Sequence, residues 1–245
     1  MNKEKLQLIW HYIVLKHLRS PKWLGMDLEI KGGPFKGMKY IPVANCSRLM
    51  PKIIGCYESA IIPWILDIPM RKYEVILDVG CAEGYYAIGF AFQNYANKIY
   101  AFDIEEEALD NARQLASINK VSDKIVFDGL CDEVKISTLC KDRKALVFCD
   151  IEGAEKTLLD PSKIPMLRDV DLIVESHDFI VPGMINKLIE RFQGTHHIEI
   201  VADSYVNMEK FPLLQQFNNR TRQKFSNEGR PAGMMWVRLT VSSVP

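Results

Sequence analysis

The spacing of apolar and polar residues divides the chain near residue 70. From position 73 on, short apolar runs alternate with longer stretches whose apolar residues recur every three or four positions. The short runs predict buried strands and the longer stretches predict helices. The strands are expected at 74–80, 98–104, 124–129, 145–151 and 171–177, and helices at 84–94, 105–119 and 182–192. Continuous apolar strands separated by helices indicate a mostly parallel sheet that helices cover on both faces.

The end of the chain shows a different pattern. Two strand-like stretches, 196–203 and 233–241, have no clear long helix between them. They predict an antiparallel strand pair at one edge of the sheet. The fold class is therefore α/β, a Rossmann-like, doubly wound, three-layer α/β/α arrangement. His196 and His197 are neighbours in a strand and should point to opposite faces, so a shared ligand role is not expected.

The first 70 residues read as a lead-in to this core. We expect a helix that ends at Arg19, and a hairpin at 27–43 around a glycine-rich turn. A further helix is expected at 51–69, with Pro51 in its first turn and Pro63 as a kink. The expected organisation is a cap of residues 1–70 packed on a core domain of residues 71–245.

The amino-acid composition limits the kinds of partner that the chain is expected to bind. The 31 basic residues balance the 31 acidic ones, and this argues against a polynucleotide held by charge. The six cysteines form neither a C-x-x-C pair nor a zinc-like spacing, so we expect small buried side chains in a reducing, cytoplasmic setting. The apolar run at 6–15 is too short to span a bilayer. We expect it to pack on its own domain, with a membrane-surface helix as the alternative.

The stretch "VILDVGCAEGYYAIG", residues 75–89, predicts a strand, a glycine turn and a helix. Ligands of open α/β sheets bind at the carboxyl ends of the strands, where Asp78, Gly80 and Gly84 lie. The dinucleotide fingerprint fails because Tyr85 stands where a third glycine is needed. Asp78 and Glu83 would also repel a pyrophosphate. They suit a cofactor with an ammonium and a sulfonium group, so the turn favours S-adenosylmethionine over NAD.

The next two strands carry matching carboxylates. Asp103 lies 25 positions after Asp78, at the distance of an acidic residue that accepts hydrogen bonds from both ribose hydroxyls. Ile104 beside it is expected to pack on the adenine. The third strand ends at Asp128 and Gly129, where the carboxylate is placed to accept from the adenine amino group.

These motifs resemble those of the class I S-adenosylmethionine-dependent methyltransferases. A narrower resemblance is to the FkbM-type methyltransferases, and it covers roughly residues 33–239. Ala82 departs from the glycine of many class I members, but FkbM-type proteins commonly lack that glycine too. The segments that carry the narrower resemblance are "GPFKGMKY" at 33–40, "GCYES" at 55–59, "DIEGAE" at 150–155 and "IVESHD" at 173–178.

The resemblance implies S-adenosylmethionine as cofactor and methyl transfer as the reaction. It also implies that Tyr57 and Glu58 close over the cofactor. The acceptor that the FkbM resemblance favours is a hydroxyl of a small molecule, a sugar or a natural-product intermediate.

The residues after the fourth and fifth strands are candidates for catalysis. Asp150, Glu175 and His177 should face the same crevice as the glycine turn. His177 is the preferred base because its ordinary pKa lies near neutrality. Asp150 is expected to contact the cofactor's methionine part or the acceptor. Glu152 and Glu155 are expected to orient the loop or to pair with basic residues. An oxygen and nitrogen metal site at the three catalytic candidates is an alternative, but nothing in the spacing demands it, and no metal is predicted.

Three rival functions remain at this point. An RNA or protein methyltransferase is the first, although the asparagine-proline-proline-aromatic motif of one amino-methylating class is replaced by "DIEG". A protein that binds the cofactor without catalysis is the second. A nicotinamide-dependent oxidoreductase is the third, and the missing glycine pattern counts against it.

Overall fold

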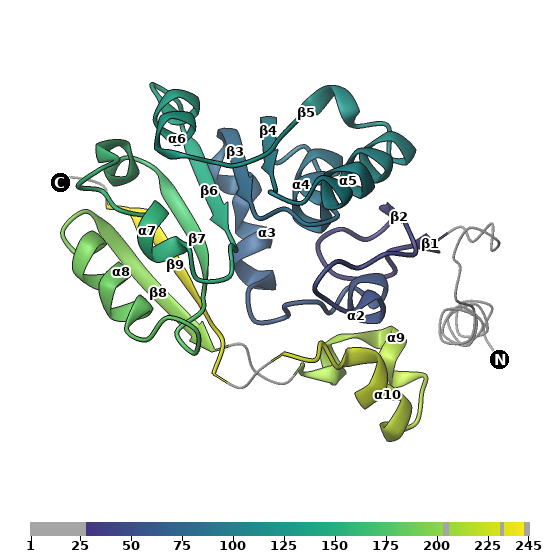
Figure 1. Ribbon diagram of the computed structural model, residues 1–245. Helices are drawn as coiled ribbons and strands as arrows, with labels where there is room; N and C mark the ends of the chain where they lie inside the picture. The colour runs from purple at the N-terminus through teal and green to yellow at the C-terminus, as the bar shows by residue number, and fades with distance from the viewer. Residues whose placement is uncertain (1–27, 203–205, 231–232, 243–245) are drawn as a thin grey trace.

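A seven-stranded sheet forms the centre of the molecule (Figure 1). The structure, a computed structural model, describes residues 28–202, 206–230 and 233–242. The strands are β3 (Tyr73–Val79), β4 (Ala96–Phe102), β5 (Ile125–Asp128), β6 (Ala145–Cys149), β7 (Asp171–Ser176), β8 (His196–Ala202) and β9 (Met235–Val241). Their order is β5-β4-β3-β6-β7-β9-β8, and β9 runs antiparallel to both of its neighbours. This confirms the expected mostly parallel sheet with an antiparallel C-terminal end.

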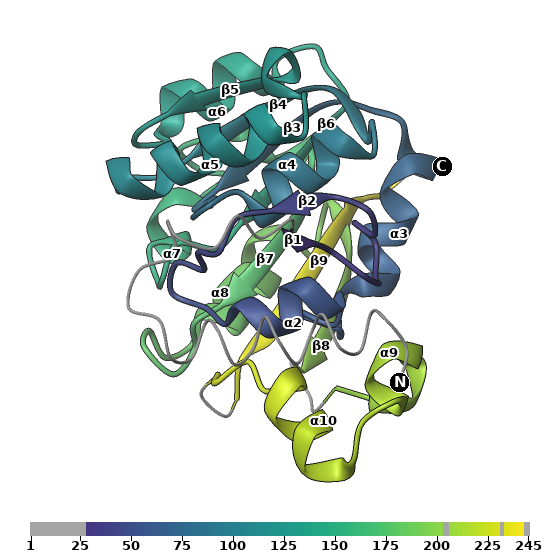
Figure 2. The same cartoon turned by 90° about the vertical axis from the view of Figure 1, so that its right-hand side faces the viewer.

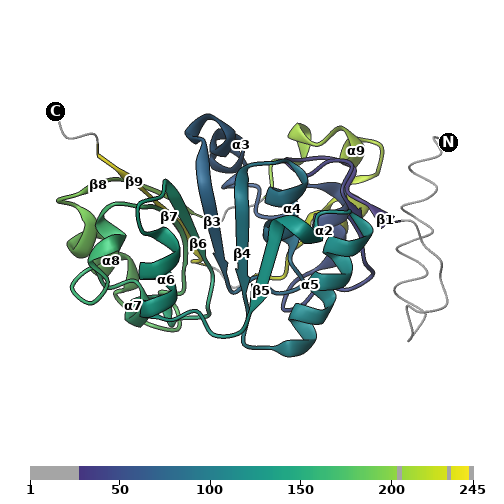
Figure 3. The same ribbon diagram turned by 90° about the horizontal axis from the view of Figure 1, so that it is seen from above.

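Helices cover both faces of the sheet, as Figure 3 shows from above. One apolar core lies between the sheet and the helices α2 to α5, with α9 and α10 at its border. A second core lies on the opposite face under α6 and α8. The helices are α2 (Leu49–Ile54), α3 (Ile62–Arg71), α4 (Tyr85–Phe92), α5 (Glu106–Ile118), α6 (Glu133–Cys140), α7 (Glu155–Leu158), α8 (Met184–Phe192), α9 (Pro212–Gln215) and α10 (Asn219–Ser226). The three-layer prediction is confirmed.

The strand register brings the predicted site residues to one level. Val79 of β3 pairs with Phe102 of β4 and with Cys149 of β6, all in parallel. Cys149 in turn pairs with Val174 of β7. The residues that follow these four positions therefore emerge side by side at the carboxyl edge of the sheet.

The predicted hairpin is present in the lead-in. Strand β1 (Leu28–Glu29) pairs antiparallel with β2 (Lys39–Tyr40). Phe35, in the turn, packs edge-on against Tyr85, Tyr86 and Phe90, with ring centroids 5.2, 5.9 and 5.8 Å apart. Figure 2 shows the hairpin of β1 and β2 next to α4. The described lead-in therefore shares the core of the sheet domain.

The prediction of one helix at 51–69 was wrong, because the segment forms α2 and α3. Gly55 ends α2 with a φ of 85°, and a Cβ there would meet the carbonyl oxygen of Gly32 at 2.0 Å. This close approach of two backbones requires glycine and stops the helix. Pro63 does not kink a helix but lies in the first turn of α3. The helix predicted to end at Arg19 lies outside the described residues.

The cysteine prediction held for five of six residues. Cys46 is exposed, whereas Cys56, Cys81, Cys131, Cys140 and Cys149 are buried, and all six are free. His196 is buried and His197 exposed, as expected for strand neighbours. Within the described ranges, no helix combines the length and apolar character that a membrane crossing requires.

Candidate active site

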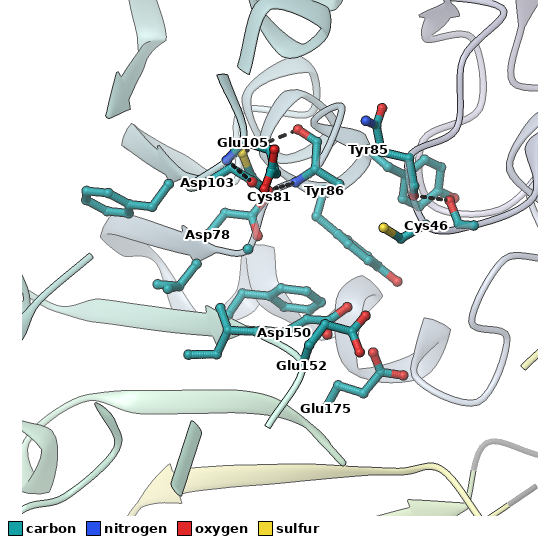
Figure 4. A pocket seen from close by; sticks show the side chains of 18 of the residues that line it. Cys46, Asp78, Cys81, Tyr85, Tyr86, Asp103, Glu105, Asp150, Glu152 and Glu175 are labelled. Atoms are coloured by element: carbon teal, nitrogen blue, oxygen red, sulfur yellow. Dashed lines mark hydrogen bonds between the residues drawn. The ribbon is translucent and has the colours of Figure 1, made fainter. Parts of the chain in front are cut away.

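A cavity of about 490 Å³ opens at the carboxyl edge of the sheet (Figure 4). The ends of β3, β4, β6 and β7 form its floor, and the lead-in and the segment before β9 form its walls. Its lining is rich in acid and poor in base. The lining acids are Glu58, Asp78, Asp103, Glu105, Asp150, Glu152, Glu175 and Glu228, and the lining cations are Lys52 and Arg230. Such a cavity attracts a cation.

The glycine turn brings the backbone close to the cavity. Gly80 has a φ of 85°, and a Cβ there would meet the carbonyl oxygen of Asp150 at 1.7 Å, so only glycine fits between the ends of β3 and β6. Ala82 follows with a φ of 49°, in the left-handed region that glycine favours. Its N–H donates to Asp103 Oδ2 at 2.8 Å. The aspartate at the end of β4 thus stabilises the turn after β3.

Asp78, near the end of β3, is a buried acid without a full set of partners. It is 2% exposed, and its Oδ2 accepts no hydrogen bond from any described residue. Burial raises its pKa to about 8, and the nearby carboxylates of Asp150 and Asp103 add to this rise. An orphaned buried acid that lines a cavity is placed to bind a cationic group.

The end of β4 presents one polar and one apolar surface to the cavity. Asp103 lines the cavity. Both of its carboxylate oxygens accept hydrogen bonds from the backbone: Oδ1 from Glu105 N at 2.9 Å and Oδ2 from Ala82 N. Each oxygen keeps a further lone pair for a ligand. Ile104 and Leu130 line the same region and are 74% and 65% exposed. These two side chains offer flat apolar contact.

Three carboxylates meet at the other end of the cavity. Asp150 follows β6, Glu175 lies in β7, and Glu152 lies in the loop after Asp150; Figure 4 shows their side chains together. One carboxylate oxygen of Asp150 and one of Glu175 lie within 4.8 Å of each other. Burial raises the pKa of both. Tyr86 points its ring toward this group and donates its hydroxyl to Glu58.

His177 lies behind these carboxylates. It is 1% exposed and is not among the residues that line the cavity. Its Nδ1 is 2.9 Å from Glu155 Oε1, and its Nε2 is 3.5 Å from Asp150 Oδ1 and 3.4 Å from Glu152 Oε2. Although burial lowers the pKa of His177, the hydrogen bond to Glu155 and the nearby acids outweigh this and raise it. The prediction of direct contact with an acceptor must be corrected, because Asp150 and Glu152 stand between the imidazole and the cavity.

Arg230, in the segment before β9, was missed from the sequence. Its guanidinium donates to Glu58 and Glu175, to Glu228 Oε2 at 3.0 Å and to Tyr57 Oη at 3.0 Å. Planar donors in a fork suit several carboxylates at once. Arg230 therefore joins the lead-in, β7 and its own segment across the cavity. The sequence offers only one weak indication of this role, which is that Arg230 stands between a glycine and a proline shortly before the last strand.

Comparison with known proteins shows which family the central part of the chain matches. A family model described as a methyltransferase domain matches residues 71–164. This part of the chain is a class I S-adenosylmethionine-dependent methyltransferase domain. S-adenosylmethionine is its cofactor, and the chain is an enzyme. Among curated proteins, no sequence matches the chain significantly.

Solved structures resemble the methyltransferase in fold. An rRNA methylase from Streptococcus thermophilus is 14% identical with a TM-score of 0.51, and the match covers 75% of this chain and 97% of that one. The O-methyltransferase TomG from Streptomyces achromogenes, involved in tomaymycin synthesis and solved with S-adenosylmethionine, is 10% identical with a TM-score of 0.49. That match covers 75% and 80% of the two chains. At 14% identity, the likeness to the rRNA methylase concerns the fold alone.

The cavity of the methyltransferase fits the cofactor on its own chemistry. The orphaned Asp78 Oδ2 suits an ammonium group, and the acid lining suits the sulfonium charge. Gly80 leaves room for close approach to the backbone. Asp103 can accept from a ribose diol, while Ile104 and Leu130 can hold a flat base. When bound, the cofactor supplies a methyl group that its sulfonium activates.

Asp128 does not take the place predicted for it in the methyltransferase. Its carboxylate accepts from Lys135 Nζ at 2.6 Å and from Gly129 N at 2.7 Å. The bond to Lys135 lowers the pKa of Asp128. Gly129 and Leu130 line the cavity, whereas Asp128 does not. The predicted contact of this carboxylate with adenine is therefore corrected, because Lys135 occupies it.

Two residues of the glycine turn serve the fold rather than the cavity. Glu83 is fully buried and accepts from Tyr40 Oη at 2.6 Å and from Asn45 N at 3.0 Å. It also pairs with Lys52, so its carboxylate faces the lead-in. A Cβ on Gly84 would meet the Ile88 side chain at 2.1 Å, so this glycine permits helix packing. Neither Glu83 nor Gly84 lines the cavity, and both cofactor assignments are corrected.

The remaining predicted residues belong to the cavity lining. Glu58, Asp78, Gly80, Tyr85, Asp103, Ile104, Gly129, Asp150 and Glu175 all line the cavity. Tyr85 presents a buried hydroxyl that has no hydrogen-bond partner in the described structure. It is a further polar group that a bound ligand can satisfy.

Proposed function

We propose that the enzyme transfers the methyl group of S-adenosylmethionine to a hydroxyl group of a small molecule, with sugars and natural-product intermediates as the favoured class. The single observation that carries this proposal is the meeting of Asp150, Glu152 and Glu175 at one end of the cofactor cavity. A hydroxyl is a weak nucleophile, and it gains from a group that takes its proton. Amine acceptors need less help of this kind.

Asp150 is the residue we place against the acceptor. Its Oδ1 is buried and accepts no hydrogen bond from the described residues, although Asp150 lines the cavity. His177 supports it from behind and acts as a positioning residue rather than as the direct base. The "DIEGAE" and "IVESHD" segments that supply these groups support membership of the FkbM type.

The lead-in belongs to the proposed site as a cap. Asn45, Cys46, Lys52, Tyr57 and Glu58 come from it and line the cavity. We propose that residues 1–70 close over the bound cofactor, which leaves methyl transfer to residues 71–245. The free cysteines support action in a reducing compartment, and we propose the cytoplasm.

The acid lining weakens the case for an RNA acceptor. The cavity is lined by eight acidic and two basic residues. A polynucleotide carries a negatively charged phosphate on every nucleotide, so this lining would repel it. A small neutral or cationic acceptor avoids that repulsion.

The test is methyl transfer from labelled S-adenosylmethionine to defined acceptor pools. The pools are sugars and polyols, amines, RNA, and proteins. We expect label in a hydroxyl-bearing small molecule, with mass spectrometry locating the methyl on oxygen. Asp150→Asn should slow turnover while cofactor affinity changes less. Label found only in RNA or protein would contradict the proposal, and cofactor binding without turnover on any pool would favour a non-catalytic role.

A further inference from the structure

A cluster of possible metal ligands lies beside the cofactor cavity, at the ends of β6 and β7. One donor atom from each of Asp150, Glu175 and His177 lies within 4.8 Å of the others. Glu152 lies next to this cluster, with its Oε2 3.4 Å from His177 Nε2. Asp150, Glu152 and Glu175 also line the cavity, so part of the cluster is open to it.

The orientation of His177 is an independent sign of a metal ion. Its Nδ1 contacts Glu155 Oε1 at 2.9 Å, and Glu155 is fully buried and also accepts from Ile151 N. A neutral imidazole that donates from Nδ1 to Glu155 directs the lone pair of Nε2 at Asp150 and Glu152. Metal-binding histidines are commonly held in this way by a carboxylate on the far nitrogen.

The distances around His177 fit a shared cation. His177 Nε2 is 3.5 Å from Asp150 Oδ1 and 3.4 Å from Glu152 Oε2. A charge-assisted hydrogen bond would draw these atoms to about 2.7–2.9 Å. Two ligands bound to one ion at about 2.0–2.2 Å lie about 3 to 3.6 Å apart for tetrahedral to octahedral angles. Asp150 Oδ1, moreover, has no hydrogen-bond partner in the described part of the chain.

We propose that His177, Asp150, Glu152 and Glu175 bind a divalent first-row metal ion, with Glu155 as the residue that orients His177. One imidazole among carboxylates suits Mn²⁺ or Zn²⁺ better than Ca²⁺ or Mg²⁺, which prefer oxygen ligands alone. Arg230 donates to Glu175 Oε1, and the ion would share the Glu175 carboxylate with it.

The role of the ion rests on the proposed function. An ion at this place would face the acceptor end of the cavity and lower the pKa of a bound hydroxyl. Its binding, however, can be measured without any acceptor, so the two proposals can fail separately.

The test uses the full-length protein after chelator treatment. Mn²⁺ is titrated in and the free ion is followed by its electron paramagnetic resonance signal, with Zn²⁺ and Mg²⁺ in parallel calorimetric titrations. We expect one saturable Mn²⁺ site per chain and much weaker binding of Mg²⁺. His177→Gln and Asp150→Asn should each weaken binding at least about 10-fold, and Glu155→Gln by about 10- to 100-fold. Glu105→Gln, an acid of the same cavity outside the cluster, should leave Mn²⁺ affinity unchanged.

Two results would overturn the site. One is no saturable Mn²⁺ or Zn²⁺ binding by the wild-type protein. The other is equal loss of binding in Glu105→Gln and His177→Gln, since this would show diffuse attraction to acid. Circular dichroism of each variant shows whether weaker metal binding comes from a lost ligand or from a lost fold. Nitrogen-15 resonances of the His177 ring should shift when Zn²⁺ is added, and unchanged resonances would also count against the site. Methyl transfer without a metal site would leave the proposed function standing.

Discussion

The raised pKa of Asp78 predicts that cofactor binding depends on pH. Burial raises its pKa to about 8, so at neutral pH the free enzyme carries it mostly protonated. A cofactor ammonium favours the ionised form, and binding below pH 8 must then release a proton. We expect affinity for S-adenosylmethionine to rise from about pH 6 to pH 8, by up to about 10-fold per pH unit.

Calorimetry in two buffers of different ionisation enthalpy measures that proton directly. The observed heat of binding should differ between the buffers below pH 8. Asp78→Asn should bind the cofactor more weakly and show no such difference. A wild-type affinity that falls between pH 6 and pH 8 would refute this account.

Asp103 and Asp128 form a matched pair at the ends of neighbouring strands. Asp103 lines the cavity, whereas Asp128 is held by Lys135 outside it. Hydrogen bonds to a charged acceptor contribute about 1.5–3 kcal/mol. Asp103→Ala should therefore weaken S-adenosylhomocysteine binding about 10- to 100-fold, and Asp128→Ala should leave it nearly unchanged. Equal losses in the two variants, measured by calorimetry, would contradict the assignment.

The positions of single site residues could be predicted only in part from the sequence. Alternation and strand ends place Asp78, Asp103 and Asp128 on one edge, and all three do lie there. Which carboxylate faces a ligand depends on competing partners. Lys135, which captures Asp128, comes from the following helix α6, and no local pattern indicates its direction.

At the scale of elements, hydrogen bonds and an ion pair of Glu83 connect the lead-in to the glycine turn. It receives hydrogen bonds from Tyr40 and Asn45 and pairs with Lys52, whose side chain is 3% exposed. Glu83→Gln removes the charge that Lys52 needs. Breaking a buried ion pair costs about 3–5 kcal/mol, so we expect a loss of this size in the free energy of unfolding.

Urea denaturation measures that loss, with Glu107→Gln on the exposed side of α5 as the control. The control should change stability by no more than about 0.5 kcal/mol. If Glu83→Gln were equally harmless, the ion pair would not be what secures the lead-in.

The boundary between α2 and α3 shows what periodicity leaves out at this scale. The apolar spacing of 51–69 is continuous, and it predicts one helix. The break at Gly55 arises from the hairpin, whose Gly32 backbone leaves no room for a side chain. Such a contact joins segments far apart in the sequence.

For the whole molecule, Arg230 links three distant parts of the chain. Glu58 lies in the lead-in, Glu175 in β7 and Glu228 next to Arg230. Arg230→Met removes this counter-ion from Glu58 and Glu175, which are 1% and 2% exposed. We expect the free energy of unfolding to fall by about 3–5 kcal/mol.

Arg230→Lys serves as the matched variant. It keeps the charge but lacks the planar fork, so it should recover only part of the stability and of the cofactor affinity. Full recovery by lysine, in denaturation and in calorimetry, would show that charge alone matters.

The overall architecture was the most predictable level. Seven apolar runs, read with their intervening helices, gave the layers and the antiparallel end, because burial on two faces imposes a pattern on every strand. The strand order and the contacts of Arg230 depend on residues that are far apart in the sequence. Local sequence patterns therefore do not predict them.

The position of β9 has a consequence for synthesis of the protein. This strand is the last that the structure describes along the chain, yet it lies between β7 and β8. Until β9 leaves the ribosome, β7 keeps an unpaired edge, and Glu175 lacks Arg230, which lies five positions before the start of β9. A nascent chain must therefore hold an open sheet edge after β3 to β8 have emerged. Such an edge invites pairing with other chains, and chaperones that shield strands would act at this moment.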